Sequence, residues 1–213
     1  MHIPDGVLTP PVWMSLAGVS AAAVGLASAK VRHELEDRQV PVAGVLGAFV
    51  FAAQMLNFPI TPGTSGHLVG TSLLTVLVGP WLAMLVMSAV LVIQCFVFHD
   101  GGLTALGANI FNMAVLGAGT TALVLRLSRR MVGDGKSRLV AGALGGWLSV
   151  FLGAVTTTLE LVVSGTTPLW PALIPMASIH ALIGLCEGAI TVAALGYILG
   201  VRPDVVRAFE PRR

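Results

Sequence analysis

The chain begins Met-His-Ile-Pro-Asp-Gly, and its first two residues together carry the groups of a metal chelate. The terminal amine of Met1, the backbone nitrogen of His2 after loss of its proton, and His2 Nδ1 can close adjoining five- and six-membered rings around one ion. These rings hold three nitrogens in a plane, and a fourth nitrogen completes a square. Among nitrogen and oxygen donors, that geometry is diagnostic of Ni(II) or Cu(II).

His67 is the best candidate for the fourth nitrogen because it follows the flexible run Pro-Gly-Thr-Ser-Gly. Imidazole also suits zinc, and no cluster of Cys or Met points to Cu(I). Each residue alone has a plainer interpretation. A histidine at position two is often incidental to a polar terminus, His67 fits a helix cap, and Asp100 before two glycines fits a turn.

The composition is that of an integral membrane protein. The 213 residues are 55% hydrophobic and 10% charged, with a mean hydropathy of +0.89, whereas soluble domains carry roughly 25% charged residues. A helix needs about 20 apolar residues to cross a bilayer, which leaves no room for a separate soluble domain. We therefore expect residues 1–213 to form a single membrane domain.

Seven apolar segments are separated by Gly, Pro and charged residues. They run from Pro11 to Ala29, Val40 to Leu56, His67 to Val78, Trp81 to Phe98, Ala105 to Leu127, Leu139 to Val163 and Pro171 to Leu199. These segments predict an all-α bundle of seven helices. The third is short and follows an irregular stretch, and non-helical backbone at membrane depth survives only in a protein interior or a wet cavity. We therefore expect residues 57–66 to fold inward at a site.

The basic residues predict the orientation of the bundle in the membrane. The twelve Lys and Arg residues form three clusters, and each cluster follows an odd number of segments: Lys30, Arg32 and Arg38; Arg126, Arg129, Arg130, Lys136 and Arg138; Arg202, Arg207, Arg212 and Arg213. Because cytoplasmic loops are enriched in Lys and Arg, we expect an outside amino terminus and a cytoplasmic carboxyl terminus. Residues 1–10 are then an extracellular segment, 11–199 the transmembrane bundle and 200–213 a cytoplasmic tail. The opening lacks the basic residues of a signal peptide, so we expect Met1 to be the mature terminus.

Several polar residues within the apolar segments are further candidates. His180 and Glu187 share one helical face, and Glu160 lies in the preceding segment. Ionisable groups inside a membrane are costly and mark functional sites by default, although polar packing explains them equally well. Gly142 with Gly146, and Gly184 with Gly188, predict close helix contacts. Gly133–Ser137 resembles the end of a phosphate-binding loop but has Arg130 where that motif needs glycine, so we expect no ATPase in this chain.

Four motifs identify a family resemblance. MHIPDG at the start, GTSGHLVGTSLL around His67, GGLTALGANIFNMA from Gly101, and the Glu187-Gly188 pair closely resemble the NikM/CbiM family, the nickel and cobalt substrate-binding membrane subunits of energy-coupling factor transporters. The resemblance covers nearly the whole chain. It implies a seven-helix subunit with an outside amino terminus that holds its metal through Met1, His2 and His67, with two donors from His2.

The resemblance also implies the partner subunits and the membrane location of this subunit. The family works with a membrane coupling (T) subunit, a pair of cytoplasmic ATPases and often a small accessory membrane subunit, in a bacterial or archaeal plasma membrane. We therefore expect a transporter subunit rather than an enzyme, with no nucleic-acid partner. MHIPDG is more similar to the nickel branch than to the cobalt branch, which more often continues with Met-Glu after His2-Ile3. Ni(II) also outranks Co(II) in intrinsic affinity, so we expect Ni(II) as substrate, with Co(II) as the alternative.

Other residues are expected to orient these donors, since outer-shell groups fix metal ligands. The candidates are Asp5, Ser65, His99, Asp100 and Asn109. His99 stands where members of the family often have other residues. Two rival functions remain at this point: an intramembrane enzyme with a metal on His67, His99 and Asp100, and a scaffold whose histidines are incidental.

Overall fold

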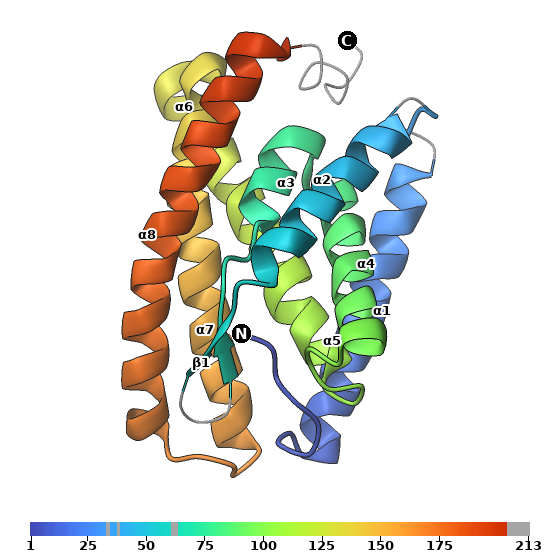
Figure 1. Ribbon diagram of the computed structural model, residues 1–213, viewed down its shortest axis with the longest axis vertical. Coiled ribbons are helices and arrows are strands. Elements are labelled where there is room, and N and C mark those ends of the chain that lie inside the picture. The colour runs from blue at the N-terminus through green and yellow to red at the C-terminus, as the bar shows by residue number, and fades with distance from the viewer. Residues whose placement is uncertain (33–34, 38, 61–63, 204–213) are drawn as a thin grey trace.

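The computed structural model describes residues 1–32, 35–37, 39–60 and 64–203 (Figure 1). In chain order, its elements are α1 (Pro10–Val31), α2 (Gln39–Gln54), β1 (Phe58–Ile60), β2 (Thr64–Gly66), α3 (Thr71–Val78), α4 (Pro80–Phe98), α5 (Leu106–Ile110), the π-helical η1 (Phe111–Leu116), α6 (Gly117–Val140), the π-helical η2 (Ala141–Gly145), α7 (Gly146–Val163) and α8 (Leu169–Val201). Each of the seven predicted segments contains a helix, so the predicted helical bundle is confirmed.

Five helical stretches are long and apolar enough to cross a membrane. They are Pro10–Val31, Pro80–Phe98, Leu106–Asp134, Lys136–Val163 and Leu169–Val201. The other two helices are shorter: α2 has 16 residues and α3 has 8. All eight residues of α3 are buried, so this short helix packs in the protein interior.

Two predicted segment boundaries are wrong. The third segment was expected to be helical from His67, but α3 begins only at Thr71, because Gly70 has a left-handed φ of 78°. The fifth segment was expected to end at Leu127, but helix continues to Val140 and leaves helical geometry only at Gly133. The residues after Leu127 include Arg, Met and Lys, which are good helix formers, and only glycine adopts the φ of 75° found at Gly133 without strain.

The irregular stretch before His67 forms a small antiparallel hairpin rather than a loop without secondary structure. Phe58 pairs with Gly66, and Ile60 pairs with Thr64. The hairpin lies beside α8 (Figure 1), and the Thr64 hydroxyl donates to Met176 Sδ of that helix at 3.0 Å. Ile60, Thr64 and Gly66 are buried, whereas residues 57–59 are exposed, so the expected inward fold holds for Ile60 and β2 and not for the start of the stretch.

The ends of the bundle differ in charge. The carboxyl ends of α1 and α8 and the kink of α6 lie at one end, and the connection between α7 and α8 lies at the other (Figure 1). Lys30 is in the last turn of α1, and Arg202 caps α8. The described parts of the three basic clusters therefore share one end. Arg38, Arg207, Arg212 and Arg213, and the expected tail beyond residue 203, lie outside the described residues.

Glycines bring α8 against the chain before and within α7, as their spacing predicted. A Cβ on Gly188 would lie 2.7 Å from the backbone oxygen of Ala143, and a Cβ on Gly146 would lie 3.4 Å from Gly188 Cα. Such close backbone approach is possible only where side chains are absent. This contact fixes α8 with His180 and Glu187 buried in the bundle.

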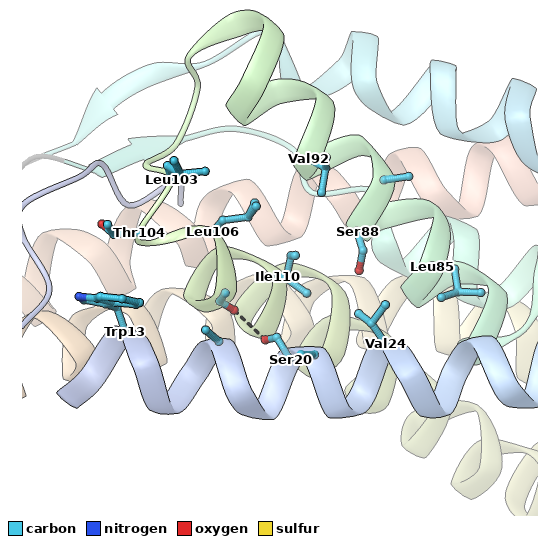
Figure 2. Close-up of a pocket in the computed structure, with 14 residues that line it drawn as sticks. Trp13, Ser20, Val24, Leu85, Ser88, Val92, Leu103, Thr104, Leu106 and Ile110 are labelled. Atoms are coloured by element: carbon cyan, nitrogen blue, oxygen red, sulfur yellow. Dashed lines mark hydrogen bonds between the residues drawn. The ribbon is translucent and has the colours of Figure 1, made fainter. Parts of the chain in front are cut away.

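A groove of about 510 Å³ opens between α1, α4 and α5 (Figure 2). Trp13, Ser20 and Val24 enter it from α1, opposite Ser88 and Val92 of α4. The Ser20 hydroxyl already has a partner within the groove wall, since it donates to the Gly107 carbonyl at 2.7 Å. The groove is predominantly apolar, and Met1, His2 and His67 do not line it.

Candidate metal centre

The opening segment enters the bundle and is held there through its backbone. The Ile3 N–H donates to Asn109 Oδ1 at 2.8 Å, and Asn109 Nδ2 donates back to the Ile3 carbonyl at 3.2 Å. The same carbonyl accepts from the Gly102 N–H at 2.8 Å. The predicted outer-shell residue Asn109 therefore positions the residue that follows His2.

Asp5 ties the segment to the connection between α4 and α5. Its carboxylate accepts from the N–H groups of Leu103 at 3.0 Å and Thr104 at 2.7 Å, and from the Thr104 hydroxyl at 2.5 Å. These bonds, that of the hydroxyl above all, lower the pKa of Asp5. Gly102 lies so close that a Cβ would be 2.3 Å from the Asp5 nitrogen. The arrangement supports the expectation that Asp5 holds the opening segment by hydrogen bonds.

Ser65 of β2 faces the two backbone nitrogens of the predicted chelate. The Met1 amine donates to the Ser65 carbonyl and, at 3.3 Å, to its Oγ. The His2 N–H donates to the same Oγ at 3.3 Å. Met1 is 1% exposed and His2 is 4% exposed. The hairpin thus brings Ser65, 64 residues away in the chain, against both nitrogens.

The side chain of Gln94 fixes the tautomer of His2. Its Oε1 lies 3.2 Å from His2 Nε2, and because a carboxamide oxygen only accepts, Nε2 is the donor. The lone pair of the neutral ring is therefore on Nδ1, the nitrogen that the chelate requires. Asp100 Oδ1 lies 3.3 Å from Nδ1, but the pair lacks hydrogen-bond alignment, and Nδ1 has no hydrogen-bond partner among the described residues.

His67 stacks on His2 and presents a second free lone pair. The two ring centroids are 4.6 Å apart, with 23° between the ring planes. His67 Nδ1 donates to the Leu68 carbonyl at 2.8 Å, which leaves the lone pair on Nε2. His67 is 1% exposed, and its Nε2 has no hydrogen-bond partner in the described part of the chain. Unpartnered buried polar atoms are rare and call for an explanation.

The residues after His67 are held by two helices. Glu187 of α8 accepts from the N–H groups of Val69 at 2.6 Å and Gly70 at 2.8 Å. Gln54 of α2 donates through Nε2 to the Val69 carbonyl at 2.6 Å. Glu187, predicted as an intramembrane functional candidate, therefore fixes the backbone that carries His67.

Burial keeps these nitrogens neutral. All three residues lie in non-helical segments outside the membrane-spanning helices. Burial lowers the pKa of the Met1 amine to about 4 and that of His2 to about 3. Burial, followed by the charges of the Met1 amine and of His2, holds the pKa of His67 well below its usual range. Burial raises the pKa of Asp100, against the opposing effects of the Met1 amine and Asn57. Neutral amines and imidazoles are the forms that bind metals.

The remaining predicted residues lie at different places. His180 is fully buried in α8, where Nδ1 bonds to the Met176 carbonyl at 2.8 Å and Nε2 has no hydrogen-bond partner among the described residues. Its charge contributes to the low pKa of His67. His99 is exposed and takes the left-handed conformation that ends α4, and it makes no described contact with the chelate. Glu160 accepts from Asn112 Nδ2 at 2.9 Å in a separate polar cluster.

Three residues that support the site were not named as candidates from the sequence: Gln54, Gln94 and Asn57. Gln94 was not considered, although a single amide in the last turns of an apolar helix is a recognisable signal. Asn57 donates through Nδ2 to Asp100 Oδ2 at 3.1 Å. The part of the chain that the structure describes contains no group of three or more His, Cys, Asp or Glu side chains placed to hold a metal ion.

Comparisons with known proteins identify the relatives of the chain. Residues 2–205 match the family model described as the cobalt uptake substrate-specific transmembrane region, CbiM. The chain is 40% identical to a putative fused nickel transport protein NikMN of Archaeoglobus fulgidus, over 97% of this chain and 68% of that protein. It is 34% identical to the cobalt transport protein CbiM of Sorangium cellulosum, over 97% of this chain and 94% of that protein.

A solved structure has the same fold. The crystal structure of a truncated transition metal transporter superposes with a TM-score of 0.85 at 31% identity, covering 94% of this chain and 99% of the other. The five apolar helices and these relatives identify a multi-pass membrane protein that acts in transport rather than as an enzyme. The chain belongs to the CbiM family of nickel and cobalt transport membrane proteins.

Proposed function

We propose that the protein captures Ni(II) through a square of four nitrogens: the Met1 amine, the His2 backbone nitrogen, His2 Nδ1 and His67 Nε2. The observation that carries this proposal is the pair of free lone pairs on His2 Nδ1 and His67 Nε2, buried on stacked rings beside the Met1 amine. Three of the four donors come from one dipeptide, so the site depends on a free amine at Met1.

Binding in this site releases protons. The His2 N–H, which donates to Ser65 Oγ at 3.3 Å, must lose its proton before the nitrogen can bind the ion. The Met1 amine and both imidazoles are already neutral near pH 7 because burial lowers their pKa values. Most of the proton release is therefore assigned to the His2 amide.

Nickel is preferred over cobalt on the chemistry of the donors. A planar set of nitrogens suits Ni(II), and Ni(II) has the higher intrinsic affinity for a given site. Relatives named for nickel transport and for cobalt transport both match the chain, so Co(II) is the alternative substrate.

The proposed transport cycle is the one that the family resemblance implies. The proposed subunit is one membrane domain in the plasma membrane, with Met1 facing outside and the basic end of the bundle in the cytoplasm. It captures the ion, and a membrane coupling subunit with two cytoplasmic ATPases, and in some systems a small accessory membrane subunit, drives its release inward. The shared location of the described basic residues at one bundle end supports this orientation.

Metal content of purified protein tests the site. The wild type is expected to retain nickel, whereas a variant with one alanine inserted between Met1 and His2 loses it because the chelate rings no longer close. His67→Ala removes the fourth donor and should also lose the nickel, while His99→Asn should retain the nickel.

Mass spectrometry of the wild type checks that Met1 is unprocessed. Retention of nickel by the insertion variant would refute the site, and titration with Co(II) in competition decides the preferred ion.

A further inference from the structure

The end of α4 contacts both ring nitrogens of His2. The Gln94 side chain bonds to Nε2, and Asp100 places Oδ1 near Nδ1. Asp100 is held there by its own N–H, which donates to the Gln94 carbonyl at 3.0 Å across the left-handed residue His99. The backbone conformation at the carboxyl end of α4 therefore determines where Asp100 lies relative to the His2 ring.

The contact between His2 Nδ1 and Asp100 Oδ1 brings two hydrogen-bond acceptors together. Because Nε2 carries the proton of the neutral ring, the Nδ1 lone pair faces a carboxylate oxygen 3.3 Å away. Two acceptors repel unless a positively charged species lies between them. Asn57 Nδ2 donates only to the other oxygen, Oδ2, at 3.1 Å. Oδ1 is thus left facing a predicted metal donor.

The separation of these two atoms fits ligands of a single ion. Two donors that lie about 2.1 Å from a metal, at right angles to each other, are about 3.0 Å apart. The observed 3.3 Å between Nδ1 and Oδ1 is close to this value. Asp100 could therefore bind an ion above the nitrogen plane, beside His2 Nδ1, without a change in backbone.

Asp100 is also more accessible than the nitrogens. Its side chain is 18% exposed, whereas that of His2 is 3% exposed. An ion that approaches from solvent can reach the carboxylate while the nitrogens remain covered. A hard oxygen ligand also suits an ion that still carries its water.

We propose that Asp100 is the entry ligand of this transporter: its Oδ1 binds the arriving hydrated divalent ion and passes it to His2 Nδ1, after which the remaining nitrogens close around it. Asn57 holds the carboxylate in place during this step. The inference rests on the proposed nitrogen site and concerns the rate at which that site fills.

Stopped-flow mixing of the purified metal-free protein with NiCl2 tests this inference, with the absorption band of planar nickel as the signal. Asp100→Asn is nearly isosteric but removes the carboxylate ligand, and it is expected to lower the association rate constant by about tenfold or more, the size of effect seen when a group that supports metal binding is removed. The final nickel content should stay at the wild-type level. Asn57→Ala keeps the carboxylate and should cause a smaller decrease, and His99→Asn, on the exposed neighbour, should cause none.

The salt dependence of the rate distinguishes direct binding of the ion by Asp100 from long-range attraction by its negative charge. At about 1 M ionic strength the Debye length is about 3 Å, so an effect of the charge alone would disappear, whereas direct binding by Oδ1 should keep Asp100→Asn slow. An unchanged rate, a defect that vanishes in high salt, or a change only in dissociation would overturn the role of Asp100. Failure of the wild type itself to bind nickel would instead refute the nitrogen site.

Discussion

The carboxylate of Glu187 in α8 binds the backbone of Gly70, 117 residues earlier in the chain, at 2.8 Å. The neighbouring amide of Val69 uses the other carboxylate oxygen. The turn between His67 and α3 thus depends on a distant helix, and movement of α8 would act directly on His67.

Glu187→Gln should weaken nickel binding without abolishing folding. The amide side chain has a single oxygen acceptor, so one of the two N–H groups, buried at Val69 and partly buried at Gly70, loses its partner at a cost of about 1–3 kcal/mol. Displacement of the His67 turn should lower nickel affinity by about 10-fold or more, as for other outer-shell changes. Isothermal titration and thermal unfolding check both effects, and Glu187→Ala should be worse in each. Equal affinity in all three proteins would contradict the role of this contact.

Gly102→Ala should displace the opening segment. The new Cβ would lie 2.3 Å from the Asp5 nitrogen, a distance that neither backbone can accommodate without movement. We expect loss of bound nickel while the helical circular dichroism spectrum is retained. Gly119→Ala is the matched control, since a Cβ there has no atom within 4 Å, and it should bind nickel normally. Normal binding by Gly102→Ala would show that the contact is dispensable.

Asn109→Asp tests the reciprocal pair with Ile3. The carboxylate still accepts from the Ile3 N–H, but it cannot donate to the Ile3 carbonyl as Asn109 Nδ2 does. A buried carbonyl then loses one donor and faces a negative charge, and a loss of about 1–3 kcal/mol in unfolding free energy is expected. Asn109→Ala removes both bonds. Chemical unfolding in detergent measures the losses, and no change in either variant would contradict the inferred anchoring.

The contribution of the Met1 amine to the stability of the metal-free protein should decrease as the pH is lowered from about 8 to about 4. The pKa of the Met1 amine is about 4 in the folded protein, against a usual value of 8.0, so in this window the unfolded chain binds a proton that the folded chain does not. Protonation therefore favours unfolding, and the lowered pKa of His2 adds to this effect below its usual value of 6.5. Thermal unfolding at several pH values checks the direction. Saturating nickel should steepen the dependence, because binding also releases the amide proton.

The helical segments could be predicted because they depend on runs of apolar residues, which are a local property. The start of α3 could not, since it depends on the left-handed Gly70 and on its contact with Glu187. The hairpin was missed for a similar reason: Ile60 and Thr64 are buried by other elements, not by their own sequence pattern.

The candidate donor atoms could be proposed from the sequence because Met1 and His2 are neighbours in the chain, so the geometry of their nitrogens follows from covalent structure. The groups that orient them were only partly predictable. Asn109 and Ser65 lay within recognisable motifs, but the contact of Gln94 with His2 Nε2 depends on where α4 ends relative to the opening segment. Such contacts between distant elements leave no periodic signal in one sequence.

Burial of the candidate donors has a consequence for ions that are far more abundant than nickel. Met1, His2 and His67 are each at most 4% exposed, so an ion that reaches them must give up most of its bound water. Mg²⁺ dehydrates reluctantly, and both Mg²⁺ and Ca²⁺ prefer oxygen ligands. Nitrogen ligands bind these two ions too weakly to compensate for the free energy of dehydration. The burial of the site would therefore itself exclude the common divalent cations.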